Sequence, residues 1–158
     1  MKTKNFLRDV RRNVVIGISL LSLARCADRG TLLFDGEIEG QKVRYFDGDV
    51  FTDTDGKSDV LEVYSKEDGE RLYKVFVDED ENGVIGDNPF DRYEVYDQNG
   101  IKVVYKSLRV IDKNGRVYGG SDEISRTALE ISRTRLKEAT GDYQRIKQKI
   151  QERLGQEL

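Results

Sequence analysis

The stretch "RYEVYDQNGIKVVY", Arg92 to Tyr105, decides the fold class of this 158-residue chain. It holds two runs rich in Val and Tyr, residue types that favour β-strands. Between the runs stands Asn99-Gly100, a pair that supplies the positive φ angles required by tight hairpin turns. Such turns join adjacent antiparallel strands, so this stretch predicts a β-hairpin.

The same arrangement recurs through residues 31–120. Further turn signals are "EDGE" at Glu67–Glu70 and "DKNG" at Asp112–Gly115. The other strand-like runs are "KVRYF", "VLEVY", "RLYKVFV", "IKVVYKSLRVI" and "RVYG". Together they predict an antiparallel β-meander of about five to seven strands, one face of which is apolar and needs a cover.

Residues 121–158 have the pattern of a long amphipathic helix, so the expected fold class is α+β. The segment "EISRT" occurs twice, seven residues apart, which predicts that Ile124 and Ile131 share one face. The predicted apolar stripe continues through Ala128, Ala139, Tyr143, Ile146, Ile150 and Leu154. Gly141 interrupts the pattern and predicts a kink or a break there.

Two uses of this C-terminal helix are open. It covers the apolar face of the sheet or packs on the N-terminal helix, because amphipathic helices and half-apolar sheets commonly satisfy each other. Alternatively, it binds a protein partner or a second copy of the chain as a coiled coil.

Residues 1–30 form a basic segment with an apolar run, Val14 to Ala24, followed by Cys26. The run of eleven residues is shorter than the ~20 needed to span a bilayer, but it fits the apolar core of a secretory signal. "LARC" resembles the lipobox of bacterial lipoproteins, which implies acylation of Cys26, although Arg25 departs from that pattern. The alternative is an ordinary packed helix with apolar residues at spacings of three and four.

These two readings lead to different locations. A signal or anchor places the protein outside the cytoplasm or at a membrane surface that the N-terminus contacts, whereas a packed helix leaves a cytoplasmic protein. The chain has no His and no Trp, and its only Cys is Cys26. His-based catalysis, an internal disulfide and Cys/His zinc sites are therefore excluded.

Charge is distributed unevenly along the chain. Residues 1–30 carry seven Lys/Arg against two Asp/Glu, residues 31–100 carry seven against twenty, and residues 101–158 carry thirteen against eight. The net charges are therefore +5, −13 and +5. An anionic middle argues against nucleic-acid binding, since phosphates would be repelled, and it favours a cation or a basic partner.

The most acidic loop is "DEDENGVIGDNPFD", residues 78–91, with six carboxylates in fourteen residues. A hairpin connection usually needs about two to five residues. Asp78, Asp80 and Asn82 stand at positions 1, 3 and 5, Gly83 is at position 6, and the carbonyl of Val84 would be offered at position 7. This spacing resembles the first half of an EF-hand or dockerin calcium loop.

The loop departs from that pattern at position 12. An EF-hand has Glu there, and this chain has Pro89, so Asp87 or Asp91 would have to supply the missing carboxylate from a different register. The alternative reading is a solvated acidic turn, because Asp and Gly are abundant in turns.

A second acidic loop, "DGDVFTDTDGKSD", spans residues 47–59. Asp53, Asp55 and Asp59 resemble the ligands of the DxDGxxD calcium loops of FG-GAP-type repeats, and Asp49 would compensate for Phe51 at position 1. The resemblance implies Ca²⁺ as the bound ion. Mg²⁺ is less suited, because it rarely uses all-protein cages.

From Gly36 onward the layout also resembles a group of small uncharacterised archaeal proteins with a sheet and a long C-terminal helix. The matching residues are Glu37, Gly40, Val43, Tyr45, Leu61, Glu62, Val63, Leu108, Val110, Gly115, Tyr118, Asp122 and Glu123. The resemblance implies a sheet-plus-helix fold and brings no activity with it.

The sequence contains no nucleophile elbow, no phosphate loop and no Trp platform for sugars. The expected function is therefore a non-enzymatic, calcium-binding domain that is exported or membrane-tethered and has a structural or interaction role. The alternative is an intracellular protein–protein interaction module acting through the C-terminal helix.

Overall fold

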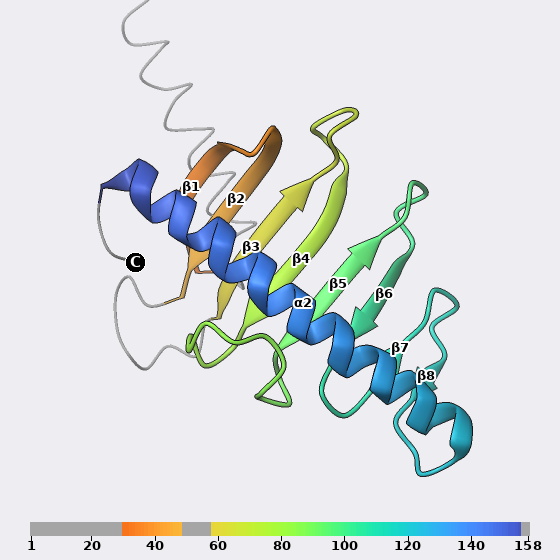
Figure 1. Cartoon of the computed structure of the whole chain (residues 1–158). Helices are drawn as coiled ribbons and strands as arrows, with labels where there is room; N and C mark the ends of the chain where they lie inside the picture. Colours follow the sequence, from red (N-terminus) through yellow and green to blue (C-terminus); the bar gives the residue numbers. More distant parts are fainter. Residues whose placement is uncertain (1–29, 49–57, 156–158) are drawn as a thin grey trace, which may run out of the picture.

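The structure, a computed structural model, describes residues 30–48 and 58–155. It consists of one sheet of eight strands in chain order, every neighbouring pair antiparallel, and one long helix that runs diagonally across the sheet (Figure 1). The elements are β1 Thr31–Ile38, β2 Gln41–Asp47, β3 Asp59–Tyr64, β4 Leu72–Asp78, β5 Arg92–Tyr96, β6 Lys102–Tyr105, β7 Val110–Ile111, β8 Val117–Tyr118 and α2 Glu123–Leu154.

The predicted α+β meander with a C-terminal helix is confirmed. The tight turns are also confirmed, since the amides of Gly69, Gly100 and Gly115 close them with hydrogen bonds of 2.9 to 3.1 Å. The predicted N-terminal helix, Cys26, Asp49, Asp53 and Asp55 lie outside the described residues.

The strand count of eight exceeds the prediction for two reasons: β1, Thr31–Ile38, was not among the predicted runs, and residues 101–111 are not one strand. The chain turns after Tyr105, and the amide of Lys106 donates to the carbonyl of Arg109 at 3.0 Å. The two residues inside this turn, Ser107 and Leu108, include no Gly, Asn or Pro, so the usual turn signal is missing.

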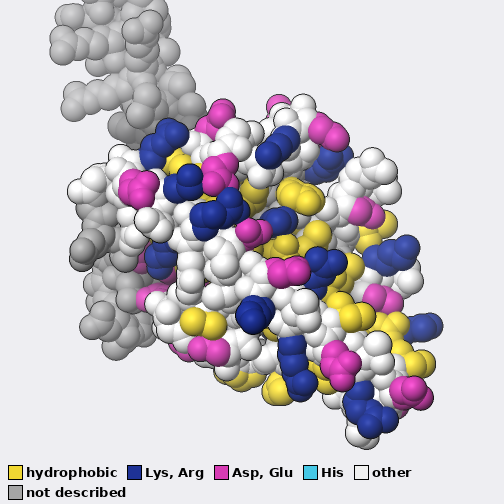
Figure 2. Space-filling view, in the orientation of Figure 1, with side chains coloured by type: hydrophobic (Ala, Val, Ile, Leu, Met, Phe, Trp, Pro, Cys, Tyr) yellow, Lys and Arg dark blue, Asp and Glu magenta, His cyan; other side chains and the backbone are white. Residues whose placement is uncertain are grey.

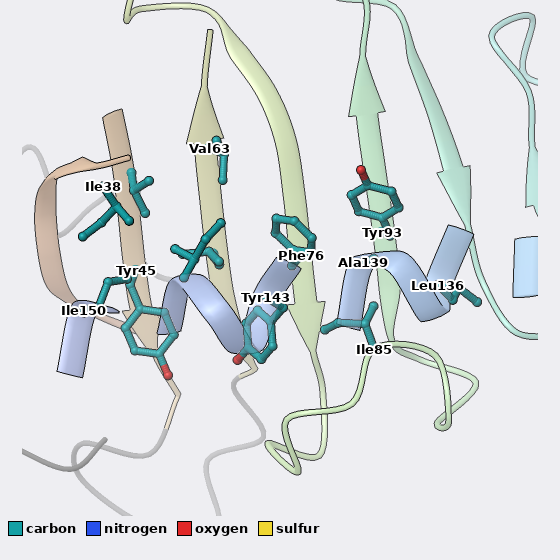
Figure 3. Close-up of a cluster of buried hydrophobic side chains, with 13 residues drawn as sticks. Ile38, Tyr45, Val63, Phe76, Ile85, Tyr93, Leu136, Ala139, Tyr143 and Ile150 are labelled. Atoms are coloured by element: carbon teal, nitrogen blue, oxygen red, sulfur yellow. The ribbon is translucent and has the colours of Figure 1, made fainter. Parts of the chain in front are cut away.

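One face of the sheet packs against α2. Tyr143 and Ile150 of the helix are completely buried, as are Leu61 and Phe76 of the sheet. Figure 3 shows Tyr143, Ile150 and Phe76 among the side chains gathered between helix and strands. The ring of Phe76 stacks on that of Tyr93, with centroids 5.1 Å apart. The helix is therefore part of the core.

The helix α2 is continuous through Gly141, so the predicted kink or break is wrong. Gly141 lies on the exposed side, while its neighbours are held to the sheet: Thr140 Oγ1 accepts from the amide of Ile85 at 3.0 Å, and Asp142 pairs with Lys74 at 3.2 Å. These contacts on both sides outweigh the weak helix propensity of one exposed glycine, about 1 kcal/mol.

The predicted apolar stripe is wrong at its N-terminal end. Ile124 and Ile131 are 69% and 52% exposed, and the buried positions are Ser125, Ser132, Leu136, Ala139, Tyr143, Ile146 and Ile150. Ser132 faces the sheet because its hydroxyl donates to the carbonyl of Lys106 at 2.9 Å. A polar contact with the sheet thus decides which face of the "EISRT" repeats is inward.

The opposite face of the sheet, here called the far face, carries a smaller apolar cluster of Phe46, Val60, Val75 and Val77. The outer side of α2 is covered by interleaved acidic and basic side chains (Figure 2). Within residues 30–48 and 58–155, no helix is both long and apolar enough to cross a membrane.

Two isoleucines on the same helix provide a matched test of this packing. Ile150→Ala removes a fully buried side chain and is expected to lower the free energy of unfolding by roughly 2–5 kcal/mol. Ile131→Ala removes an exposed one and should change it by no more than about 0.5 kcal/mol. Denaturant unfolding measures both, and equal effects would contradict the orientation of α2.

Candidate metal centre

The acidic residues meet at one edge of the sheet. Asp59 begins β3 and Asp78 ends β4, and the two are direct partners in the antiparallel ladder. The connection from β4 to β5 leaves after Asp78 and returns at Asp91, immediately before β5. Strand pairing therefore brings together carboxylates that lie up to 32 residues apart in the sequence.

Two buried carboxylates organise the loop between β4 and β5. Asp78 Oδ2 accepts from the amide of Gly83 at 2.8 Å, and Gly83 has a φ of 81°, a conformation that glycine adopts without strain. Asp91 accepts from the amides of Glu79, Gly86 and Asn88 at 2.8, 3.1 and 3.2 Å. The loop is thus wound around its own first and last carboxylates.

The loop is also fastened to α2. Ile85 is 2% exposed and belongs to the main core. Gln144 Nε2 donates to the carbonyl of Gly83 at 2.8 Å. A Cβ on Gly86 would lie 2.7 Å from Leu136, so only glycine permits this close approach. Folding of the loop and docking of the helix therefore depend on each other.

The carboxylates of Asp78, Asp80 and Asp91 form a cluster in which one oxygen from each lies within 4.8 Å of the others. Asp78 and Asp91 are completely buried, whereas Asp80 is exposed. Asp78 Oδ1 is buried and has no hydrogen-bond partner within the described part of the chain. A buried acceptor without a partner is rare and costly, and a hard cation is a partner suited to it.

The electrostatics of the cluster are unfavourable without a counter-charge. Burial raises the pKa of Asp78 to about 6, and the nearby carboxylates of Asp59 and Asp91 add to the effect. The hydrogen bond from Gly83 opposes it. Burial also raises the pKa of Asp91 despite its three backbone donors. Both groups would gain from a bound cation.

The other predicted ligands of this loop lie at its exposed rim. Asn82 Nδ2 donates to Asp80 at 3.0 Å and to Asp87 at 2.7 Å, while Asn82 Oδ1 accepts from the amide of Val84 at 2.7 Å. Asp80, Asn82 and Asp87 therefore lie side by side next to the buried pair. Asp87 is linked to the other rim residues by its hydrogen bond from Asn82.

Asp91 is the residue that sequence reasoning undervalued. It stands at position 14, and a turn shortens the path to it: the amide of Asp91 donates to the carbonyl of Asn88 at 3.2 Å, with Pro89 inside the turn. Asn-Pro is a turn-initiating pair, so this signal was present in the sequence. The turn precedes Asp91, whose carboxylate lies in one cluster with those of Asp78 and Asp80.

Asp59 takes part in a different network beside the cluster. Its carboxylate accepts from Tyr45 at 2.6 Å, Tyr143 at 3.3 Å, Lys147 at 2.8 Å and the amide of Gly48 at 3.2 Å. Burial raises the pKa of both tyrosines well above their usual range, so they remain donors. In the described residues Asp59 holds α2 to the sheet.

Comparison of the chain with protein-family models, with curated proteins and with solved structures finds no match.

The raised pKa of Asp78 predicts a specific pH dependence in the presence of a chelator. Because the folded state binds this proton more tightly than the unfolded state does, the contribution of Asp78 to stability falls as pH rises from about 4 to about 6. At pH 7, Asp78→Asn is therefore expected to stabilise the protein by up to about 3 kcal/mol. The gain should vanish near pH 4.

Chelator-treated protein unfolded by denaturant at several pH values measures this difference. Glu130→Gln, on the exposed side of α2, is the matched control and should show no such crossover. A destabilising Asp78→Asn at pH 7 without cation would show that the bare carboxylate is not a source of strain.

Proposed function

We propose that this protein is a non-catalytic, calcium-binding domain. Asp78, Asp80 and Asp91 would supply carboxylate ligands, and the rim residues Asn82 and Asp87 would complete the shell with water. The observation that carries the proposal is the buried Asp78 Oδ1, which lacks a partner and belongs to a cluster of three carboxylates.

The donor set favours Ca²⁺ over other ions. All candidate donors are oxygens, which excludes the nitrogen and sulfur ligands preferred by zinc. Ca²⁺ accepts six to eight oxygens in flexible geometry, whereas Mg²⁺ demands a near-ideal octahedron and keeps its waters. A loop that mixes two buried carboxylates with an exposed rim suits the less demanding ion.

The proposed role of the ion is structural. The loop that would hold it contacts α2 through Thr140 and Gln144, and its Ile85 fills the core. A cation that neutralises the cluster would stabilise this loop and, through the loop, the packing of α2 on the sheet.

We place this function outside the cytoplasm or at a membrane. Calcium sites on extracellular modules bind at about 10⁻⁴–10⁻³ M, and a site with two buried carboxylates and a solvent-exposed rim suits that range. The location agrees with the signal-like run and with Cys26 in the N-terminal segment, which remain sequence-based predictions.

Calcium addition to chelator-treated protein tests the proposal directly. Ca²⁺ is expected to bind one ion per chain in calorimetry and to raise the melting temperature, with a gain of about 2.7 kcal/mol at a hundredfold excess over Kd. Asp78→Asn and Asp91→Asn should abolish both effects. Glu130→Gln should retain them, and Mg²⁺ should produce a smaller shift.

The absence of heat and of any rise in melting temperature at millimolar Ca²⁺ would exclude the proposal. Native mass spectrometry of protein from its own cells adds an independent reading. It counts the bound ions, and it shows whether the chain begins at Met1 or at an acylated Cys26.

A second candidate function, self-association through α2, is favoured by one observation. Ile124 and Ile131 lie exposed one heptad apart on the solvent side of the helix. Since the opposite side of α2 is in the core, only this outer face is available to a second copy.

The double variant Ile124→Ser/Ile131→Ser is expected to convert an oligomer into a monomer in light scattering, with little change in the unfolding free energy. Ile150→Ser serves as the contrast, because it should unfold the domain instead. A wild-type chain that is monomeric at high concentration would exclude this candidate.

A further inference from the structure

Three cations stand in one row on the far face of the sheet. Tyr93 pairs with Tyr105 and Tyr105 pairs with Val110, so the next position on each strand is occupied by Arg92, Lys106 and Arg109. Tyr93 faces α2, and side chains alternate along a strand, so these three point to the opposite face. Neighbouring strands are about 5 Å apart, which places three positive charges within about 10 Å.

The row is not neutralised by the carboxylates nearest to it. Glu94 is already shared by Arg92 at 3.0 Å, Lys102 at 2.9 Å and the hydroxyl of Tyr96 at 2.6 Å. Lys106 and Arg109 form no ion pair with any residue in the described ranges. Glu94 thus fixes Arg92 in place, while the carboxylates of Glu79 and Glu94 attract Lys106 without forming an ion pair with it.

Like charges directly opposite each other destabilise a sheet. Lys106 shows this strain, because burial lowers its pKa and the adjacent Arg109 and Arg92 lower it further. The chain nevertheless places Lys106 between two arginines, one on β5 and the other across the turn between β6 and β7. An anion lying across the row would relieve this repulsion.

The cations border a hollow that has room for such an anion. The hollow measures about 590 Å³ and is lined by Arg92, Lys106 and Arg109 together with Lys102, Lys113, the carboxylate Glu94 and the apolar side chains Val104 and Ile111. Five cations thus face two carboxylates, Glu94 and Asp112. Asp112 also borders the hollow, but its carboxylate already accepts hydrogen bonds from the amides of Asn114 and Arg116 in its own turn. The site is therefore a positively charged depression with an apolar floor.

We propose that this hollow binds a phosphate group, with Arg92, Lys106 and Arg109 as its ligands. Arginine presents a planar fork of donors that matches a phosphate oxyanion, and lysine adds a point charge between two such forks. The apolar floor would contact the organic part of a phosphomonoester or of an anionic lipid headgroup. The site lies on the face of the sheet opposite α2 and does not require the calcium centre.

Backbone amide NMR of the full chain in chelator tests the site with two probes. The first is inorganic phosphate, and the second is phosphatidylcholine vesicles with or without phosphatidic acid. Saturable shifts at the amides of residues 92, 106 and 109 are expected with phosphate, and they should weaken as NaCl is raised. Binding only to vesicles with phosphatidic acid would assign the phosphate to a lipid.

Lys106→Met keeps the aliphatic stem and removes the charge, so it should weaken binding about tenfold. Without phosphate it should raise the unfolding free energy, because the like-charge contacts are gone. Arg109→Gln, at an exposed position, is a second variant that should weaken binding similarly. Lys137→Met, on the outer side of α2, should change neither quantity.

The proposal is overturned if neither probe produces saturable shifts, or if Lys106→Met and Arg109→Gln bind as tightly as Lys137→Met. Failure of the calcium titration would leave these results unchanged, since all of them are obtained in chelator.

Discussion

Two carboxylates, Asp59 and Asp78, face each other across the β3–β4 ladder in a buried position. Like charges in such a position are unfavourable, so each needs a counter-charge or donors of its own. Asp59 receives them from Lys147, Tyr45 and Tyr143. Asp78 receives one backbone amide, and its other oxygen has no hydrogen-bond partner among residues 30–48 and 58–155. The rest of the structure depends on this difference.

The contacts of Asp59 determine how the helix lies on the sheet. Lys147 and Tyr143 are four residues apart, one turn of α2, and both reach the same carboxylate. Their positions place Ile146 and Ile150 over the sheet and turn Gly141 outward. A helix held by a buried ion pair in its C-terminal half and by Ser132 in its N-terminal half has no freedom to rotate. This explains why two exposed isoleucines are tolerated on its other side.

The meander and the helix followed from local signals in the sequence. Val- and Tyr-rich runs and Asn-Gly turns act over a few residues, so they identify hairpins without knowledge of the rest of the chain. The division of residues 101–111 into two strands was missed, because the turn at Ser107-Leu108 is stabilised by backbone bonds and by the sheet around it. The inward face of α2 was missed at its first two turns because a hydrogen bond from Ser132, and not hydrophobicity, selects it.

The sequence predicted the candidate site to a similar extent. Spacing alone identified Asp78, Asp80 and Asn82. These residues stand at alternate positions just before Gly83, so the pattern can be recognised within a few residues. The contributions of Asp91 and Asp59 depend on tertiary structure. A turn at Pro89 positions Asp91, and the packing of α2 on the sheet brings Lys147, 88 residues away, to Asp59. The spacing within a loop therefore predicts the first residues of such a site, whereas the folded sheet brings the remaining residues to it.

The net charges of the three sequence segments do not show how charged side chains are distributed over the folded protein. The middle of the chain is strongly acidic in sequence, and that fact argued against nucleic-acid binding. In the structure three carboxylates of that segment, Asp78, Asp80 and Asp91, gather where β4 ends. Arg92 of the same segment joins Lys106 and Arg109 of the basic C-terminal segment on the far face. One sheet thus carries an acidic cluster at the end of β4 and a basic hollow on its far face. Because buried or partly buried charges are screened weakly, the two proposed sites would keep their opposite ion preferences although they share one sheet.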